Sequence, residues 1–455
     1  MKIKTVRRII VILVLSFTTF VNLLAQSGNS AYFLRGSYDR YKLNPALTPE
    51  RAFVAFPCLG GFGFHSDLNV GLSNFIYDSK SKPGNLTTFM SADVSRDEFL
   101  KALPEVSEMN MNVDMELLSF GFGSEKWFAW FDAGLKNQTS LYVPKELFSF
   151  MKSALSSGDY EIRDLHAKEM IYGKAALGFQ YSPIERLSVG VSLNVLMGLA
   201  YADIGLDRMN AYMGADKWSI LADASFRYHI PGGRIILEDN KIDDFEMDGN
   251  NITVPQNYGL AFDLGAEYDL DNLVQGMKLS ASVTDLGFIN WKEVSMIVTD
   301  NNQPVTFDGY KDDDTFDDIA DKAEKMLDFY DGGAEDIRTS LDATVRFGIE
   351  YTIPAVKWLS FGELLTTCLG EVRYTESRTG LTLRGGKWFE FSTNVAFSNI
   401  GTSFGGVIDF HPAGINLFLA GELGTLELNP QYIPMDGYSA SLAFGVRLGL
   451  SKRRF

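Results

Sequence analysis

Cysteine and histidine are scarce in this sequence. Its 455 residues include two cysteines, Cys58 and Cys368, and four histidines. Two cysteines so far apart form neither a CxxC pair nor a disulfide framework, and with so few histidines they give no zinc-ligand spacing. We therefore expect no metal site and no cofactor.

Positive charge is also in short supply. Lysine and arginine total 41 against 58 aspartates and glutamates, which gives a formal net charge of −17. Nucleic-acid binding relies on clustered lysine and arginine that neutralise phosphates, so the acid excess argues against a nucleic-acid partner. Hydrophobic residues make up 46% of the chain, which argues against a disordered polyelectrolyte.

Long hydrophobic runs are missing after residue 25. Before that point, four basic residues precede an apolar run from Ile9 to Leu15. This is the pattern of a secretory signal peptide, residues 1–25, cleaved before Gln26. An uncleaved anchor is the alternative, but polar residues between 16 and 22 dilute the run. Since no later apolar stretch reaches about 18 residues, an integral membrane protein of this sequence would have to be a barrel.

Apolar residues alternate strictly with small or polar ones in several segments of the chain. Every second residue from Leu187 to Tyr201 is apolar, and the residues between them are mostly small or polar. A period of two predicts a strand with one apolar face. This strand is longer than the ~5–6 residues usual in soluble proteins. A tilted strand that crosses a bilayer needs ~9–11 residues, so the length favours a membrane strand.

The same alternation recurs along the chain. It covers about 53–72, 113–123, 127–137, 172–181, 187–201, 220–230, 258–268, 276–287, 341–351, 357–367, 369–384, 388–398, 403–411, 415–422 and 439–450. In hydrocarbon an unpaired backbone amide costs several kcal/mol, so such a sheet has to close on itself. The sequence therefore predicts an all-β, transmembrane antiparallel β-barrel over residues 51–455, with 14 strands or, alternatively, 16. A soluble double-sheet sandwich is the competing fold.

Three predicted turns share one pattern of flanking residues. In each, a segment from glycine to tyrosine leads into a segment that begins Leu-Ser; the pairs are 178–181 with 187–190, 265–268 with 279–282, and 348–351 with 359–362. Short turns of bacterial barrels face the periplasm. These turns are therefore predicted to be periplasmic, and the excursions 138–171 and 289–340 extracellular. Strand parity then requires one extra strand within 202–257, supplied by 234–238 or 252–254.

Aromatic residues near the predicted strand ends fit the interfacial girdles of a membrane barrel. They are Trp127, Tyr181, Trp218, Tyr268, Trp291, Tyr351 and Trp388.

Two segments outside the predicted strands have helical spacing. Lys145 to Leu155 places its apolar residues largely on one side, as in a helix that packs within a loop. Phe316 to Tyr330 has the same spacing inside an acidic stretch, residues 300–338. The aspartates at 312–318 do not have the ligand spacing of an EF-hand calcium loop. We interpret this stretch as a solvated acidic surface rather than a metal site.

No catalytic signature is visible. The sequence has no local pattern of a serine or cysteine nucleophile with a histidine base, and the histidines are scattered. His229 shares an inward face with Asp223 and Arg227. We interpret these three as a polar network in the lumen rather than as an active site. We therefore expect no catalytic residues and no enzyme activity.

Two short motifs resemble a known superfamily. Asn44, Pro45 and Ala46 precede the first predicted strand and resemble the NPA box of the FadL-like outer-membrane channels. Asp263–Gly265 and Asp285–Gly287, both Asp-Leu-Gly, resemble paired strands near the middle of those barrels. With the strand layout, these motifs make the sequence similar to a Bacteroidota branch of that superfamily.

The resemblance implies a location in the cell outer membrane, in contact with its lipid, and passive passage of small hydrophobic molecules. It also implies that residues 26–50 enter the lumen as a plug, with Asn44, Pro45 and Ala46 in its hatch. Proline fixes φ and holds the preceding residue extended, which suits a bend between plug and wall. An ordinary surface turn is the alternative.

Two other functions stay open. A non-transporting barrel scaffold for protein secretion or surface attachment would contact a partner through the two excursions. A barrel enzyme acting on lipid would need serine, histidine and aspartate side chains to converge, with His229 as the best candidate. The acidic 300–338 insertion has no counterpart that we recognise in fatty-acid channels.

Overall fold

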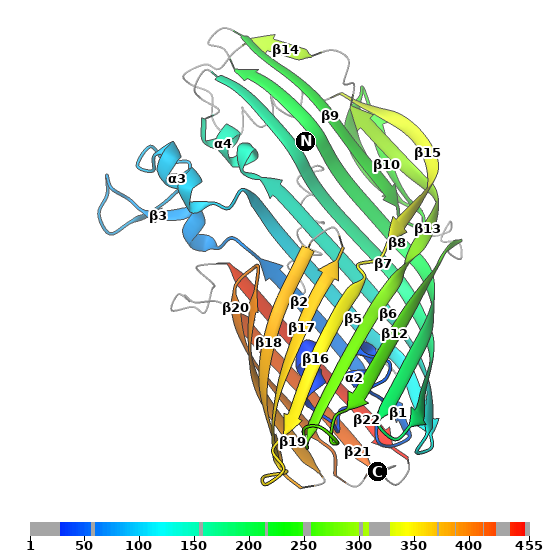
Figure 1. Ribbon diagram of the computed structural model, residues 1–455. Coiled ribbons are helices and arrows are strands. Elements are labelled where there is room, and N and C mark those ends of the chain that lie inside the picture. Colours follow the sequence, from blue (N-terminus) through cyan, green and yellow to red (C-terminus); the bar gives the residue numbers. More distant parts are fainter. Residues whose placement is uncertain are drawn as a thin grey trace.

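The chain folds into a closed barrel of antiparallel strands, seen here in a computed structural model (Figure 1). The structure describes residues 28–55, 60–153, 158–213, 217–248, 256–299, 304–308, 328–370, 373–386, 388–412, 414–424 and 437–450. The predicted signal peptide and residues 316–327 of the predicted helix Phe316 to Tyr330 lie outside these residues. The end of that predicted helix is wrong, because Tyr330 belongs to a strand, Phe329–Ser340.

Fourteen strands make up the wall within the described part of the chain. They are β1 (Phe53–Ala55) with β2 (Gly61–Leu68) as one strand, β5 (Val106–Gly123), β6 (Trp127–Pro144), β7 (Gly158–Ile184), β8 (Leu187–Met213), β12 (Asn257–Asp269), β13 (Met277–Thr299), β16 (Thr344–Thr352), β17 (Leu359–Leu369), β18 (Arg373–Arg384), β19 (Phe389–Ser398), β20 (Thr402–Phe410), β21 (Ile415–Gly424) and β22 (Tyr438–Gly449). β1 and β2 pair with β22 on one side and with β5 on the other, which closes the wall. The predicted fold and the count of 14 are confirmed.

The two faces of the wall differ in polarity. On β8, Val191 and Leu193 are 43% and 41% exposed, whereas Ser192 and Asn194, which alternate with them, are 3% and 0% exposed. On this part of β8, apolar side chains therefore cover the outside and polar ones face the lumen. This is the reverse of a soluble sandwich, where the apolar faces pack against each other, and it is the pattern of a barrel in lipid.

The three repeated turns lie at one end of the barrel, the lower end in Figure 1. They join β7 to β8, β12 to β13, and β16 to β17. Because β12 runs antiparallel to β8 and β16 antiparallel to β13, all three turns face the same way. We call this the turn end and the opposite end the loop end. The shared direction was predicted; which end faces the periplasm stays a prediction.

The expected extra wall strand in 202–257 is wrong. The required even number of wall strands between the turns arises in another way. β9 (Lys217–His229), predicted as a wall strand, pairs with residues 201–213 of β8, whereas β12 pairs with residues 187–198 of the same strand. Residues 234–238 belong to β10 (Gly233–Glu238), which forms a separate hairpin with β11 (Lys241–Met247). Residues 252–254 lie outside the described residues. Two wall strands, β8 and β12, therefore separate the first two repeated turns.

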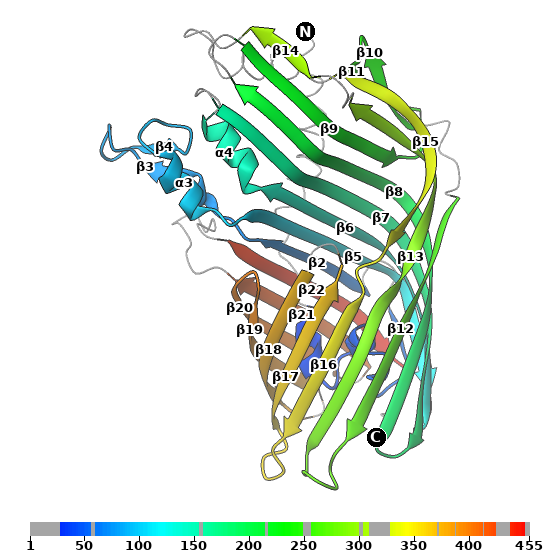
Figure 2. The same ribbon diagram turned by 45° about the horizontal axis from the view of Figure 1, so that its top comes forward.

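At the loop end the wall continues as a tall sheet on one side (Figure 2). The sheet contains the far parts of β6, β7, β8 and β13, together with β9, β14 (Val305–Asp308) and β15 (Phe329–Ser340). Trp291 of β13 lies in this region and is fully buried, and its indole N–H donates to Thr339. The expectation that Trp291 belongs to an interfacial girdle is therefore wrong. Tyr181, Tyr268 and Trp388, near the turn end, are exposed as expected.

Short helices accompany the barrel. η1 (Asn29–Phe33) and α2 (Arg40–Leu43) lie in the N-terminal part. η2 (Leu72–Asn74), α3 (Arg96–Ala102), β3 (Ile76–Asp78) and β4 (Leu86–Thr88) form a small lobe. α4 (Lys145–Ser153) confirms the predicted helix and packs against that lobe through Phe148. Among the described helices, none is both long and apolar enough to cross a membrane.

Candidate functional site

Residues 28–50, the N-terminal segment, lie inside the barrel near the turn end (Figure 1). Polar contacts join the segment to strands all round the wall. Its partners include Glu116 on β5, Gln180 on β7, Ser282 on β13, Glu350 on β16, Arg378 on β18, Asn394 on β19 and Arg447 on β22. The segment therefore lies in the lumen and contacts strands on several sides of it.

Small residues of the repeated turns provide the room for this segment. A Cβ atom at Gly190 would overlap the backbone of Pro45, and one at Gly348 would overlap the ring of Tyr32. The middle repeat has Ser282 at the position that Gly190 takes in the first repeat. The Ser282 hydroxyl donates to the backbone carbonyl of Leu43 at 2.8 Å. The repeat therefore marks a seat for the N-terminal segment as well as the positions of the turns.

Asn44 ties the segment to the wall at the predicted NPA box. Its side-chain N–H groups donate to the carbonyls of Ala266 and Ala281, both at 3.2 Å, and its carbonyl accepts from the Ala46 N–H at 2.9 Å. Asn44 is extended, with φ −152° and ψ 113°, as expected before Pro45. The box bridges β12 and β13; its role as a hatch stays a prediction.

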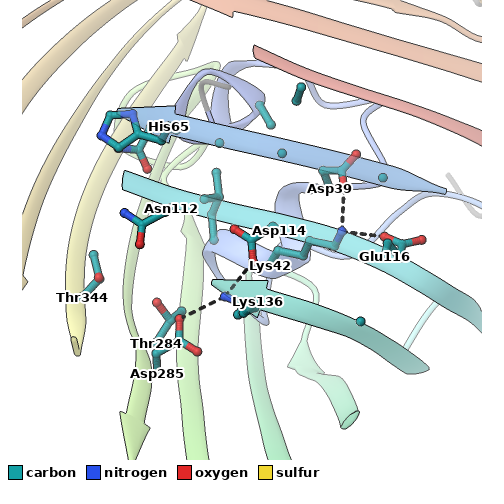
Figure 3. A pocket seen from close by; sticks show the side chains of 18 of the residues that line it. Asp39, Lys42, His65, Asn112, Asp114, Glu116, Lys136, Thr284, Asp285 and Thr344 are labelled. Carbon is teal, nitrogen blue, oxygen red and sulfur yellow. Dashed lines mark hydrogen bonds and ion pairs between the residues drawn. The ribbon is translucent and has the colours of Figure 1, made fainter. Parts of the chain in front are cut away.

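A group of charges centred on the buried Arg447 and Glu116, the Arg447 cluster, holds α2. The Arg447 guanidinium donates to Asp39 at 2.5 and 2.7 Å and to Glu116 at 2.8 Å. The Lys42 ammonium lies 2.5 Å from Glu116 and 3.2 Å from Asp39 (Figure 3). The Arg447 side chain is 0% exposed. Burial by itself would raise the pKa of Asp39, but Arg447 and Lys42 outweigh burial and lower it.

The Glu350 cluster holds the segment on another side. Glu350 of β16 lies 2.6 Å from Arg35 and 3.5 Å from Arg40, both in the N-terminal segment, and 2.8 Å from Arg384 of β18. Its side chain is 3% exposed. One wall carboxylate therefore binds two arginines of the segment.

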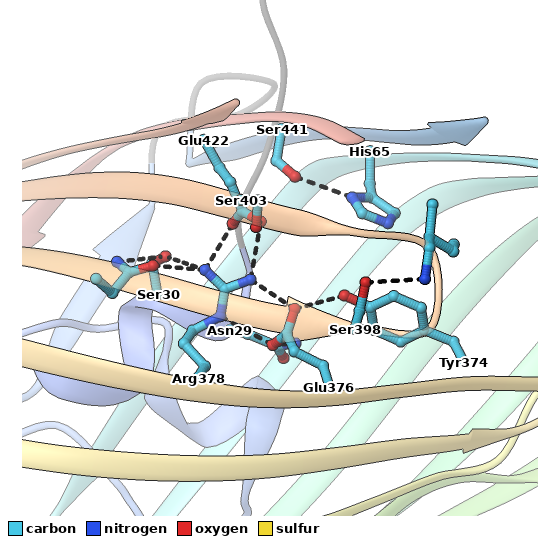
Figure 4. Close-up of polar contacts among 12 residues, drawn as sticks. Asn29, Ser30, His65, Tyr374, Glu376, Arg378, Ser398, Ser403, Glu422 and Ser441 are labelled. Carbon is cyan, nitrogen blue, oxygen red and sulfur yellow. Dashed lines mark hydrogen bonds and ion pairs between the residues drawn. The ribbon is translucent and has the colours of Figure 1, made fainter. Parts of the chain in front are cut away.

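A third group, the Arg378 cluster, lies beside η1 (Figure 4). Arg378 pairs with Glu376 at 2.7 Å and with Glu422 at 2.6 Å, and it donates to the Ser30 hydroxyl at 3.3 Å. Asn394 also donates to Ser30, at 3.0 Å. Here the charges are paired within the wall, and the segment contacts them through two neutral groups, the Ser30 hydroxyl and the Asn29 amide.

A cavity of about 340 Å³ lies on the loop-end side of the segment (Figure 3). Nine acidic and five basic residues line it together with several aromatic residues. The acids are Asp39, Asp114, Glu116, Asp132, Asp263, Asp285, Asp342, Glu376 and Glu422, and the bases are Lys42, Lys136, Lys174, Arg346 and Arg378. The described lumen is therefore highly charged and offers polar partners on several sides.

The predicted lumenal network lies elsewhere, on β9 of the tall sheet. Arg227 pairs with Asp203 at 3.8 Å and with Glu335 at 3.6 Å, while the His229 ring lies near Trp291. No ion pair or hydrogen bond in the described structure joins Asp223, Arg227 and His229 to one another. They share a strand but do not form one contact group.

The structure does bring together a serine, a histidine and an aspartate that the sequence patterns missed. His65 contacts Ser441 through Nδ1 at 2.9 Å and Asp67 through Nε2 at 2.6 Å. β2 is paired on both sides, so its backbone N–H groups are used by the strand ladder and are not free to stabilise an oxyanion. We interpret this group as a hydrogen-bond chain of the lumen wall.

Solved structures similar to the chain include two toluene transporters and a FadL homologue. The toluene transporter TbuX of Ralstonia pickettii is 9% identical with a TM-score of 0.46, over 94% of this chain and 99% of that one. The P. putida toluene transporter TodX is 10% identical with a TM-score of 0.42, over 90% and 93%. A Pseudomonas aeruginosa FadL homologue is 8% identical with a TM-score of 0.44, over 94% and 96%. A FadL homologue is thus among the similar structures, but similarity this low says nothing about the function of this chain.

Sequence comparison gives the family directly. No curated protein matches the chain. The model of a family described as a family of unknown function (DUF5723) matches residues 45–421, from the Asn44-Pro45-Ala46 box to β21. Since this match covers most of the sequence, the chain belongs to that family.

Proposed function

We propose that this protein is an outer-membrane channel for small molecules and that its N-terminal segment is the plug that closes the turn end. The observation that carries the proposal is the seating of residues 28–50 across the lumen, below a cavity. The Arg447 and Glu350 clusters hold the segment through ion pairs. Apolar side chains of the segment also pack on the wall. Residues 28–50 contribute no strand to the wall sheet, so the wall strands can stay paired when the segment leaves.

The outer face supports a membrane location. Exposed apolar side chains alternate with buried side chains, many of them polar, along β8, β12, β17 and β21. A face of this kind is costly in water, and a closed strand ladder leaves no unpaired edge for lipid to meet.

The residues that line the cavity indicate which class of solute the proposed channel carries. The resemblance to FadL-like channels predicts hydrophobic molecules. An apolar molecule that filled this cavity would desolvate charged groups without replacing their hydrogen bonds. The charged lining instead favours a small polar solute, and we propose that class of cargo.

Weakening the plug contacts tests the channel. We expect Asp39→Asn with Lys42→Met to speed solute uptake several-fold in a liposome-swelling assay, because both changes remove charge from the segment and leave the wall sequence intact. The matched control is Lys80→Gln with Glu98→Gln, which removes an exposed ion pair of 2.7 Å in the small lobe and should leave uptake unchanged. Cleavage of the segment by added protease reports its release. If the segment becomes cleavable and uptake stays at the level of protein-free liposomes, the channel proposal fails.

The tall sheet favours a second candidate, a surface scaffold. β7 and β8 have 27 residues each, far more than the ~9–11 residues that cross a bilayer. A scaffold with this surface need not conduct. A barrel that stays impermeable after release of its segment would support this alternative.

Acid should also open the plug. A carboxylate with a lowered pKa stabilises the folded state above its ordinary value of ~3.9, and this contribution is lost as pH falls from there toward the folded pKa. We therefore expect wild-type uptake to stay low from neutral pH down to about pH 4 and to rise below it. Asp39→Asn should leak across the whole range, since its amide does not titrate. Uptake measured between pH 3 and 8 checks this, and a wild-type rise near pH 6 would contradict it.

A further inference from the structure

The two Asp-Leu-Gly motifs are irregularities on neighbouring strands. The pairing of β12 with β13 shifts register between Phe262 and Leu264, beside Asp263. On β13, Asp285 has a φ of 56°, in the left-handed region that residues other than glycine adopt infrequently. Asp263 accepts a hydrogen bond from the Asp285 N–H at 2.7 Å. Backbone strain of this kind concentrates at sites that use it.

Both irregular positions turn a carboxylate toward the cavity, where two lysines meet them. Lys174 lies 3.2 Å from Asp285 and 4.0 Å from Asp263. Lys136 lies 3.8 Å from Asp285 and 3.2 Å from Asp114 (Figure 3). Side-chain exposure rises from 11% at Asp263 to 44% at Asp114. A solute that enters the cavity therefore meets Asp114 and Lys136 before the deeper pair.

Arg346 of β16 supplies a further positive group to the same cavity. Its guanidinium donates to Thr284, the neighbour of Asp285, at 2.9 Å and to Asn29 at 3.2 Å. Both acceptors are neutral, and the described residues give Arg346 no ion pair. Because neutral acceptors do not compensate its positive charge, the Arg346 guanidinium can pair with the carboxylate of an incoming solute. The planar array of N–H groups on a guanidinium matches the two oxygens of a carboxylate.

We propose that these groups form a binding site for a small zwitterion of the amino-acid type. Arg346 takes the acid group, and Asp285 with Asp114 takes the ammonium group. The cavity volume of about 340 Å³ is at the small end of ligand sites and suits such a molecule. The inference rests on the proposed channel function and narrows its cargo.

The test uses solutes of similar size in the liposome-swelling assay. L-threonine carries both charges, ethanolamine a positive one, lactate a negative one, and erythritol none. In the plug-weakened background, where the barrel conducts, we expect threonine to enter several-fold faster than erythritol. Asp285→Asn should reduce the rates of threonine and ethanolamine relative to erythritol. Arg346→Gln should reduce those of threonine and lactate. Asparagine tolerates the left-handed conformation, so Asp285→Asn keeps the fold.

The matched control is Glu293→Asn. Glu293 also lies on β13 with a left-handed φ, 51°, but it is exposed on the tall sheet and does not line the cavity. This variant should leave all ratios unchanged. Equal rates for threonine and erythritol, or equal effects of the control, would overturn the inference while leaving the channel proposal standing. If no solute enters at all, the channel proposal itself has failed.

Discussion

Replacing Arg447 by methionine is expected to release the N-terminal segment from the barrel. Asp39 and Glu116 would lose the guanidinium that binds both, and the Lys42 ammonium alone would face the buried Glu116 and the partly buried Asp39. Removing one partner of a buried charge network costs about 3–5 kcal/mol. We expect the segment to become sensitive to protease in detergent-folded barrel, and solute uptake to rise to the level of the plug-weakened variant.

Two variants sharpen this experiment. Arg447→Lys keeps the positive charge but not the bidentate hydrogen bonding of the guanidinium, so its protease sensitivity and solute uptake should be intermediate. Arg234→Met is the control, since Arg234 is 73% exposed outside the wall and its ion pair with Glu246 spans 4.0 Å. An exposed pair of this kind contributes about 0–1 kcal/mol. Full protection of the segment in Arg447→Met would show that the cluster does not hold it.

Filling the glycine seat should displace the segment by a different route. Gly190→Leu places a side chain where the backbone of Pro45 lies, and backbone cannot give way as a flexible side chain can. The overpacking cost exceeds the usual ~1–3 kcal/mol if both stay in place. We therefore expect a folded barrel with an expelled, protease-sensitive segment, and fast uptake.

The control for this variant is Gly421→Leu on β21. An added Cβ there meets nothing within 4 Å, so the same substitution in a wall strand should leave the segment protected. Heat-dependent gel mobility, which distinguishes folded from unfolded barrels, shows whether each wall has formed. A folded Gly190→Leu barrel that keeps its segment protected would contradict the seat.

The wall could be predicted because each strand presents one face to lipid and the other to the lumen. The same physics explains the error at β9. Its apolar residues alternate as regularly as those of β8, but Ile220 and Ala222 are buried, and the Tyr228 hydroxyl accepts a hydrogen bond from Ile235 of the β10–β11 hairpin. A period of two shows that one face is covered by something apolar. It does not distinguish lipid from protein.

The site was only partly visible in the sequence. Asn44 was found through a motif, whereas its wall partners were not. Asp39 and Arg447 are 408 positions apart, and Arg40 and Glu350 are 310 apart, so no local spacing connects them. Two signals were present: charges on the inward face of wall strands, and glycines at fixed places in the turn repeat. The repeat predicts the orientation of the turns. Its small residues also indicate that another part of the chain packs closely against them, and this part is the N-terminal segment.

The Asp39–Arg447 pair has a consequence for the order of assembly. Asp39 precedes the first wall strand, and Arg447 sits on β22, whose pairing with β1 and β2 joins the two ends of the sheet. The front of the chain is synthesised first, but this one of its contacts with the wall can form only when β22 is in place. A barrel that has not reached that step would lack this pair, so Asp39 would have no guanidinium partner on β22.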